Sequence, residues 1–230
     1  FATYYTPDNA VLSIAGDFDA ADARTLVERF FGPIPRGRGR PPLAPMTVPP
    51  SFGGWTRETV PDAVALPRLF LAMRSPLFGS DEYYPASVLG AVLGMGKASR
   101  LQQHLVRDRE VASDATAFTL DLAKGADLLV ADVTARPGVD ASQLEPETVR
   151  ELDLLRREGV REDEVQRAVA LIETLLVTSM QSAAERAEKL SLFATYLGDP
   201  TLVNLQLDRY NAVTAEQVSA FARRSLGEDN

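Results

Sequence analysis

The stretch LGMGKASRLQQHLVRDREVASDATAF, residues 93–118, contains the junctions between three predicted elements. Its first residue closes the apolar pattern of a helix predicted over Asp81–Leu93, and its glycines predict tight turns. Its middle predicts a second helix over Ser99–Asp108, and its end lies in a strand predicted over Val111–Leu120. We therefore expect helices and strands to pack in one body.

Further strands and helices flank this stretch. Strands are predicted over Trp55–Val60 and Leu66–Arg74 before it and over Asp127–Ala135 after it. The remainder is predicted to be helical, over Ser142–Arg157, Glu162–Leu197, Pro200–Tyr210 and Ala215–Leu226, with core side chains at Leu175, Leu176, Met180, Leu190 and Phe193. Because the strands come in adjacent pairs and the helices in runs, we predict an α+β fold, an antiparallel β-sheet with helices packed on one face.

The N-terminal region has the pattern of a smaller unit. Asn9–Asp17 (NAVLSIAGD) is typical of a buried strand, and Asp19 can cap a helix that Gly32-Pro33 ends. One strand and one helix cannot bury both of their apolar faces, so this unit needs a sheet to join. The segment from Pro33 to Gly54 is rich in Pro, Gly and Arg and is predicted to be an extended linker.

The composition excludes several classes of site. The 230 residues contain no cysteine and a single histidine, His104, and their net charge is −8. Thiolate zinc sites, cysteine nucleophiles, iron–sulfur clusters and clusters of histidine ligands are therefore excluded. The negative charge argues against nucleic acids and anionic membranes as partners, and no apolar run approaches the ~18 residues of a membrane helix. We expect no nucleic-acid partner and no membrane segment in this chain.

The glycine-rich segment from Gly90 to Arg100 does not match a phosphate-binding loop. Five residues, instead of four, separate Gly90 from Gly96-Lys97, and Ala98 follows where a Walker loop has Ser or Thr. A Rossmann pattern also fails, because Ser99 stands where the third glycine belongs. We interpret the segment as a junction between two helices.

No other pattern predicts a catalytic or metal site. His104 and Asp108 are four residues apart on one helix, but zinc needs further nitrogen or sulfur ligands. No G-x-S-x-G nucleophile elbow contains Ser75, Ser99 or Ser113, and these serines have no second histidine to share, which argues against a serine hydrolase. The acidic residues of Glu145–Asp163 and Glu185–Glu188 alternate with arginine, which predicts solvated helix faces. We expect no catalytic residue and no metal ligand in this chain.

Three phrases of the chain resemble one known family, in order and over nearly its whole length. They are YYTPDNAVLSIAGDFDAADARTLVERFFGPIPRG (residues 4–37), the stretch of residues 93–118 with its Gly-x-x-Ser-Arg-Leu signature, and AVTAEQVSAFARRSL (residues 212–226). All three are similar to the pitrilysin/insulinase family of zinc metallopeptidases, and the likeness is closest to two-domain bacterial members. That resemblance leaves the periplasm and the cytoplasm of a bacterium open as compartments.

The resemblance implies a function for the chain. Members of the family carry two α+β halves that close around an extended peptide, and their zinc is held by an inverted His-x-x-Glu-His helix of the first half. The chain lacks that motif. It resembles the last strand–helix unit of the first half (residues 1–35), a linker (36–52) and the inactive C-terminal half (53–230). We expect a chamber wall that binds peptide and does not hydrolyse it alone. Its partner would be its own catalytic half or a homologous subunit, and zinc is implied only for the missing half.

The resemblance also implies candidate site residues. Substrate-binding roles fall on Gly94, Gly96, Ser99, Arg100 and Ser113. Many relatives carry an Arg and, seven residues later, a Tyr that can stabilise an oxyanion, and these positions fall on Val106 and Ser113 here. Arg107 lies one residue out of register and would point about 100° away on a helix. Two hypotheses remain: the inactive half of a working peptidase, or an inactive scaffold or binding subunit of the same fold.

The strand–helix unit of residues 1–32 carries a separate expectation. Without the rest of its sheet it should dock abnormally, pair with another copy of the chain, or be mobile.

Overall fold

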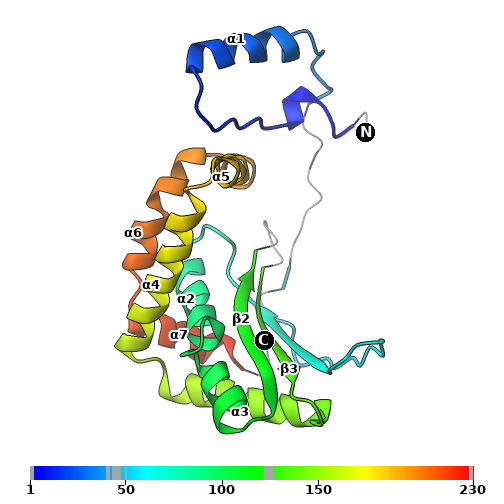
Figure 1. Cartoon of the computed structure of the whole chain (residues 1–230), viewed down its shortest axis with the longest axis vertical. Coiled ribbons are helices and arrows are strands. Elements are labelled where there is room, and N and C mark those ends of the chain that lie inside the picture. The colour runs from blue at the N-terminus through cyan, green and yellow to red at the C-terminus, as the bar shows by residue number, and fades with distance from the viewer. Residues whose placement is uncertain (1–2, 40–41, 43–47, 50, 122–126, 228–229) are drawn as a thin grey trace. The chain divides into compact units, whose positions relative to one another are not determined.

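The structure is a computed structural model that describes residues 3–39, 42, 48–49, 51–121, 127–227 and 230 (Figure 1). The chain divides into two compact units. The first unit comprises Phe1–Met46 with Leu176–Gln206, and the second comprises Thr47–Leu175 with Leu207–Asn230.

The second unit is built on a three-stranded antiparallel sheet. Its strands are β1 (Arg68–Arg74), β2 (Ala112–Leu120) and β3 (Leu128–Ala135), in the order β1-β3-β2. β3 is therefore the central strand, and Ala131 is paired with Leu71 on one side and with Ala117 on the other. The strands predicted from Leu66, Val111 and Asp127 are confirmed, each within two residues at either end.

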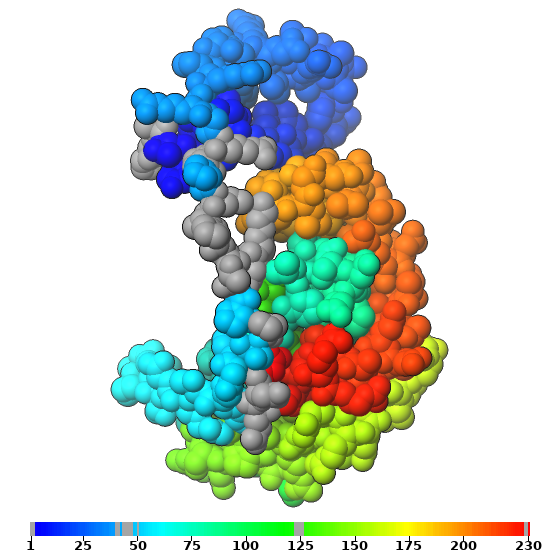
Figure 2. Space-filling model, turned by 180° about the vertical axis from the view of Figure 1, so that it is seen from behind, coloured from blue at the N-terminus to red at the C-terminus, as the bar shows by residue number. Residues whose placement is uncertain are grey.

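Helices cover one face of this sheet. The apolar helix α2 (Tyr83–Gly94) packs on β2 and β3 and contacts α7 (Ala215–Ser225), beside which it lies in Figure 2. The core that forms between them includes Leu89, Leu93, Leu101, Leu105, Leu129, Val133, Leu155 and Val218. α7 also packs on α3 (Leu144–Glu158), and Thr214 with Gln217 forms the capping box at its start. The α+β class with helices on one face of an antiparallel sheet is confirmed.

The second predicted helix has an uncommon geometry. The hydrogen-bond pattern of residues Gln102–Asp108 is that of a π-helix, here η2, and Leu105 is its buried residue. Glu110 follows it with φ 53°, a left-handed conformation that only glycine adopts without strain.

The long helix predicted over Glu162–Leu197 is wrong in one respect. Two helices replace it, α4 (Glu162–Ser179) and α5 (Ala183–Tyr196). The break falls where the Ser182 side chain accepts from the N–H of Glu185 and caps α5. A Ser-x-x-Glu pattern of this kind marks a helix start. The predicted core side chain Leu175 is 59% exposed, whereas Phe193 is buried.

Short helices complete the chain. The predicted helix over Pro200–Tyr210 is a 3₁₀ segment, η4 (Pro200–Leu205), continued by α6 (Gln206–Asn211). A second 3₁₀ turn, η3 (Ala141–Gln143), leads into α3.

Two predicted strands do not form. In the first unit, η1 (Pro7–Asn9) and α1 (Ala20–Phe31) flank a segment with no strand pairing, so the strand predicted over Asn9–Asp17 is wrong here. The strand predicted over Trp55–Val60 is also absent. A strand needs the hydrogen bonds of a neighbour, and no described residue supplies them to either segment. Asp19 caps α1 as predicted, through the N–H groups of Ala21 and Asp22, and the described part of the linker from Pro33 to Gly54 forms no strand.

Candidate functional site

The glycine-rich loop, residues 94–99, joins α2 to η2 in the second unit. Gly94 ends α2 against β2, where a methyl group on its Cα would overlap the backbone of Thr116 and Ala117. Gly96 adopts a left-handed φ of 78° and is exposed. The loop therefore combines a close helix–strand approach with a turn that a side chain would strain.

The next residues turn the loop into η2. The N–H of Ser99 donates to the Gly96 carbonyl at 3.1 Å, and its buried hydroxyl has no hydrogen-bond partner among the described residues. Gln103 donates from Nε2 to the carbonyl of Lys97 at 2.6 Å, which holds the loop against the helix that follows it. Ser99 and the two glycines therefore lie in one short loop, in which the Ser99 N–H and the carbonyls of Gly96 and Lys97 are hydrogen-bonded within the chain.

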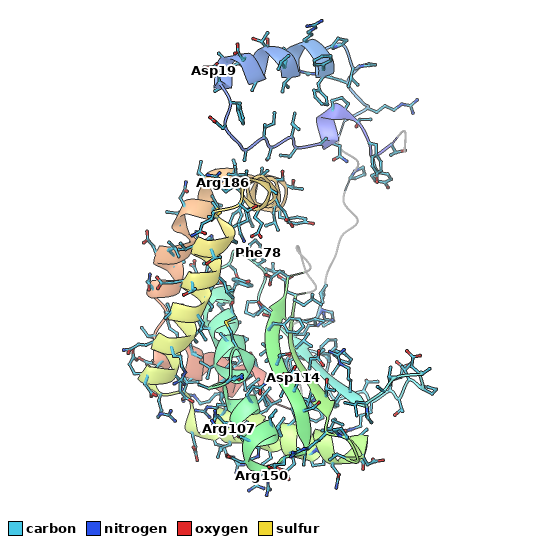
Figure 3. The ribbon with its side chains drawn as sticks, in the orientation of Figure 1. Asp19, Phe78, Arg107, Asp114, Arg150 and Arg186 are labelled. Carbon is cyan, nitrogen blue, oxygen red and sulfur yellow. The ribbon has the colours of Figure 1, made fainter. Side chains whose placement is uncertain are left out.

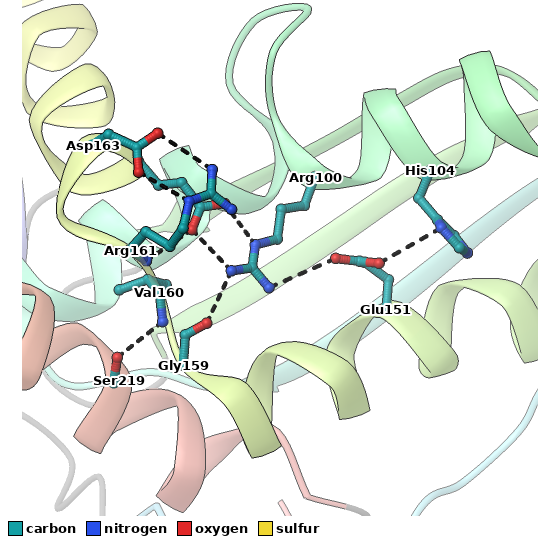
Figure 4. Close-up of polar contacts among 9 residues, drawn as sticks. Arg100, His104, Glu151, Gly159, Val160, Arg161, Asp163 and Ser219 are labelled. Atoms are coloured by element: carbon teal, nitrogen blue, oxygen red, sulfur yellow. Dashed lines mark hydrogen bonds and ion pairs between the residues drawn. The ribbon is translucent and has the colours of Figure 1, made fainter.

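Arg100 anchors the end of the loop (Figure 4). Its Nε and Nη2 donate to the two carboxylate oxygens of Glu164 at 2.8 and 2.9 Å, and Nη2 also donates to the Gly159 carbonyl at 2.9 Å. Nη1 lies 3.9 Å from Oε1 of Glu151. The guanidinium side chain is 13% exposed, so these contacts are screened only weakly by water.

His104 of η2 lies beside the same residues and faces two carboxylates of α3. Its Nδ1 lies 3.8 Å from Oε2 of Glu151, and its Nε2 lies 3.4 Å from Oε2 of Glu147. Glu147 is also held by Arg109, whose Nε donates to it at 3.0 Å. We call Arg100, His104, Glu151 and Glu164 the charge cluster.

The two buried carboxyls of the charge cluster differ in electrostatics. Burial raises the pKa of Glu151, although the charges of His104 and Arg100 oppose that shift. Burial also acts to raise the pKa of Glu164, but the hydrogen bonds from Arg100 and from the Arg161 N–H outweigh it and leave that pKa below its ordinary value. Glu164 therefore pairs with Arg100 as a carboxylate anion.

Sequence reasoning missed the two carboxylates of the charge cluster. The prediction that the acids of Glu145–Asp163 lie on solvated faces is wrong for Glu151, which is 5% exposed. Glu164, the residue that follows this range, is 4% exposed. The signal was present, because Glu151 has helical spacing with the buried positions Leu144, Thr148 and Leu155. A carboxylate on an apolar helix face needs a partner, and Arg100 is that partner.

Ser113 lies apart from the loop, at an irregularity of β2. The pairing of β2 with β3 shifts between Ala112 and Asp114, so Ser113 is the extra residue of a bulge. Its hydroxyl donates to the carbonyls of Ala135 at 3.0 Å and Thr134 at 3.4 Å, and these bonds hold it on its own sheet. The link between η2 and β2 is made instead by Gln102, which donates to Asp114 and to the Ala115 carbonyl.

Val106 stands where the resemblance implies an arginine, and its side chain has no polar group. The next residue in the sequence, Arg107, is exposed and donates to Oε1 of Gln103 at 3.2 Å on its own helix (Figure 3). Neither residue brings a donor to Ser113.

The face of the sheet that α2 does not cover, here called the open face, carries exposed aromatic side chains among the described residues, while Val130 at its centre is buried. Phe70 of β1 is 59% exposed and Phe118 of β2 is 42% exposed, and both side chains lie on the face that α2 does not cover. Arg68 spans to Asp132 on the same face, with Nη2 to Oδ2 at 2.5 Å, and its guanidinium lies 5.2 Å from the Phe70 ring. This face offers aromatic side chains beside a charged pair, which suits contact with another polypeptide.

Metal-binding and membrane-spanning features are both absent from the described ranges. Among those residues, no group of three or more His, Cys, Asp or Glu side chains could hold a metal ion. None of the described helices combines the length and the hydropathy that a membrane span requires.

Comparisons with known proteins give a consistent set of relatives. A family model described as the peptidase M16 inactive domain matches residues 1–172. An uncharacterised zinc protease of Mycobacterium tuberculosis is 29% identical over 224 residues, which cover 96% of this chain and 50% of the relative. An uncharacterised zinc protease of Bacillus subtilis is 27% identical over 229 residues, covering 98% and 53%. The chain thus spans about half the length of these curated relatives.

Solved structures share the fold. A protease from Helicobacter pylori superposes with a TM-score of 0.82 at 18% identity, covering 94% of this chain and 51% of that one. A peptidase M16 inactive domain from Pseudomonas fluorescens superposes with a TM-score of 0.71 at 18% identity, covering 93% and 50%.

Proposed function

Since the chain belongs to the family of peptidase M16 inactive domains, we propose that it is the non-catalytic half of a zinc metallopeptidase. Its role in the longer protein is to wall the substrate chamber and bind an extended peptide. The relatives that carry the name zinc protease are about twice as long as this chain, which supports a division of labour between two halves.

Zinc has no place in the described part of this chain. Zinc sites in proteins are built from Cys, His and carboxylate groups, and the chain has one histidine and no cysteine. That histidine is directed at two carboxylates, one of which is held by Arg109 and the other of which faces Arg100. The residues present do not fit a zinc site, and we propose that the metal belongs to the half of the protein outside this sequence.

We propose the following division of the chain. Residues 1–35 form the last strand–helix unit of the catalytic half, residues 36–52 form a linker, and residues 53–230 form the inactive domain. The apolar side chains of Val11, Leu12 and Ile14, exposed by 40%, 55% and 46%, support the first assignment, because they have the pattern of a strand that lacks its sheet.

The open face of the sheet is the observation that carries the chamber-wall role. A sheet with helices on one side and exposed aromatic residues on the other presents a surface that another polypeptide can cover. We propose that this face, with Phe70 and Phe118, contacts the peptide. We also propose that Gly94, Gly96, Ser99, Arg100 and Ser113 belong to the substrate-binding region, in which Arg100 holds the loop through Glu164.

One observation favours the scaffold alternative. Val106 has no donor, and the Ser113 hydroxyl is bonded to the carbonyls of β3, so neither supplies the oxyanion contact that the resemblance implies. A subunit that keeps the fold and binds a partner without cleaving peptides would show this pattern.

The experiment that separates the two is done on the longer protein. Zinc per chain is measured, together with cleavage of quenched-fluorescent peptides with and without chelator. We expect bound zinc and cleavage that chelator abolishes. Phe70→Ser should raise KM, because the open face loses an aromatic contact, and exposed Phe18→Ser in the first unit is the control. Absence of both zinc and cleavage would establish the scaffold.

A further inference from the structure

The second unit contains a pocket of about 350 Å³ between the end of β1 and the end of α7. This volume lies at the lower end of the range in which proteins bind small molecules. Its lining includes two arginines, one carboxylate, a serine hydroxyl and two apolar side chains, which are Arg74, Arg224, Glu82, Ser75, Pro76 and Phe221. Polar groups therefore share the pocket with apolar surface, as is usual where a small ligand binds.

The side chain of Asn230, which is 7% exposed, holds the two sides of the pocket together. Its Oδ1 accepts from the Arg74 N–H and its Nδ2 donates to the Arg74 carbonyl, both at 3.3 Å, as the backbone of a neighbouring strand would do. Nδ2 also donates to the carbonyl of Ser225, the last residue of α7, at 2.7 Å. The backbone at the end of β1 is thus fixed to the end of α7, with the Arg74 side chain in the lining between them.

The half-buried Arg74 has no anionic partner in the part of the chain that the structure describes. Its Cζ lies 4.1 Å from the centroid of the Phe52 ring, and its Nε is buried without a hydrogen bond to any described residue. Arg68, at the other end of the same strand, differs because it pairs with Asp132. Removing a guanidinium from water without an anion costs free energy, so this position favours a ligand that supplies a negative charge.

The other described groups of the lining leave the charge of Arg74 unbalanced. Arg224 pairs with Glu82 at 3.2 Å, so these two residues add no net charge. Ser75 adds a buried hydroxyl that has no hydrogen-bond partner among the described residues. Two helix ends border the pocket, the start of α2 at its N-cap Glu82 and the end of α7 at Ser225, and their dipoles favour opposite charges. Arg74 therefore sets the preference of the pocket, which is for a single negative charge.

We propose that this pocket binds a small monocarboxylate, with Arg74 as its counter-ion. A guanidinium presents parallel N–H groups that match the two oxygens of a carboxylate. Pro76 and Phe221 give the apolar part of such a ligand a surface on which to pack. The C-terminal end of a peptide and a free organic acid both present this group. The pocket shares no residue with the glycine-rich loop, residues 94–99, so the proposal does not rest on the proposed function.

Nuclear magnetic resonance on the 230-residue chain at neutral pH tests the proposal. The ligands added are N-acetyl-alanyl-alanine, the same dipeptide as its C-terminal amide, and propionate. We expect the amide resonances of Ser75 and Ser225 to shift saturably with the free dipeptide acid, at a Kd of about 1 mM for a ligand of this size, and not with the amide. Tighter binding of the dipeptide acid than of propionate indicates a peptide end, and equal binding indicates a free acid. An amide that binds as well as the acid, or no saturable shift with either carboxylate, would overturn the proposal.

Variants identify the counter-ion. Arg74→Gln should weaken binding of the acid by at least about tenfold, the effect of losing a hydrogen-bonded charge, and Arg74→Lys, which keeps the charge but not the paired N–H groups, should fall between. Arg223→Gln is the matched control, because it removes an exposed arginine of α7 that does not line the pocket, and it should leave the Kd unchanged. Binding that survives in Arg74→Gln contradicts the proposal, and if that variant does not fold, the comparison of acid with amide still decides it. Since the test involves neither zinc nor cleavage, its failure leaves the proposed function standing.

Discussion

Glu110 shows how one residue can hold strain in this fold. Its φ of 53° lies in the left-handed region, which costs a residue with a side chain ~1–2 kcal/mol relative to glycine. Its carboxylate pairs with Arg136 at 2.7 Å, but the side chains of Arg136 and Glu110 are 48% and 65% exposed, and such exposed pairs contribute little. We expect Glu110→Gly to raise the free energy of unfolding by about 0.5–1 kcal/mol in urea titrations. Glu110→Ala, which removes the ion pair and keeps the strain, is the control, and a glycine variant no more stable than the alanine variant would contradict the argument.

At Gly94, the first residue of the glycine-rich loop, we expect the opposite effect, because a side chain there would destabilise the fold. Only hydrogen fits between its Cα and the backbone of Thr116 and Ala117, and backbone cannot rotate away as a side chain can. Gly94→Ala should force α2 away from β2 and lower the free energy of unfolding by ~2–3 kcal/mol. Gly90→Ala is the matched comparison, because the nearest atom to its added methyl is 3.2 Å away at the end of the Leu129 side chain. Equal losses in the two variants would show that the close approach is not the cause.

At the scale of elements, the ion pair between Arg100 and Glu164 ties the start of η2 to the start of α4. Glu164→Gln leaves Arg100 with Glu151 at 3.9 Å, so we expect a loss of about 3 kcal/mol at pH 7, near the lower limit for breaking a buried pair. The pKa of Glu164 is lowered in the fold, so its stabilising effect is present above its ordinary value of 4.5 and is lost as pH falls through the folded value. The deficit of the variant should therefore shrink below about pH 4.5.

Urea titrations at pH 7, 5 and 3.5 measure this dependence. Asp153→Asn, which removes an exposed pair with Arg156 at 3.2 Å, is the control and should change stability by less than about 0.5 kcal/mol at each pH. A Glu164→Gln deficit that stays constant down to pH 3.5 would mean that the carboxylate charge is not what stabilises the fold.

Elements whose pattern is local were predictable from the sequence, and those that depend on partners were not. The core strands and α2 carry their apolar pattern within their own residues, and the capping box at Thr214 is a local signature. The break between α4 and α5 also had a local signal at Ser182, which the unbroken helical pattern masked. The strand predicted over Trp55–Val60 does not form for another reason, because a strand needs a second segment to pair with, which its own residues do not indicate.

The candidate site shows the same division. The glycine-rich loop and its turn could be recognised from spacing, and Gly94 and Gly96 have conformations that explain those residues. The charge cluster could not be assembled from the sequence, because Arg100 and Glu164 are 64 positions apart and only the folded chain brings them together (Figure 4). Burial then decides which carboxylates of an acidic, arginine-rich segment are solvated.

At the scale of the whole molecule, the segment Val11–Ile14 has the sequence pattern of a strand, but no described residue pairs with it. Val11, Leu12 and Ile14 are 40–55% exposed, although the apolar run to which they belong predicts a buried strand. If residues 1–35 belong to a catalytic half, that half supplies the missing neighbour, and backbone pairing would bury these side chains.

Amide hydrogen exchange can test this expectation residue by residue. In the 230-residue chain we expect fast exchange at Val11–Ile14 and slow exchange in the central strand, at Leu129 and Val133, which are fully buried. In the longer protein the exchange at Val11–Ile14 should slow by at least about tenfold, a change of ~1.4 kcal/mol in local opening. Exchange at Val11–Ile14 that is already as slow as at Leu129 in the shorter chain would show that this segment finds a strand partner without the other half. Light scattering would then decide whether that partner is a second copy.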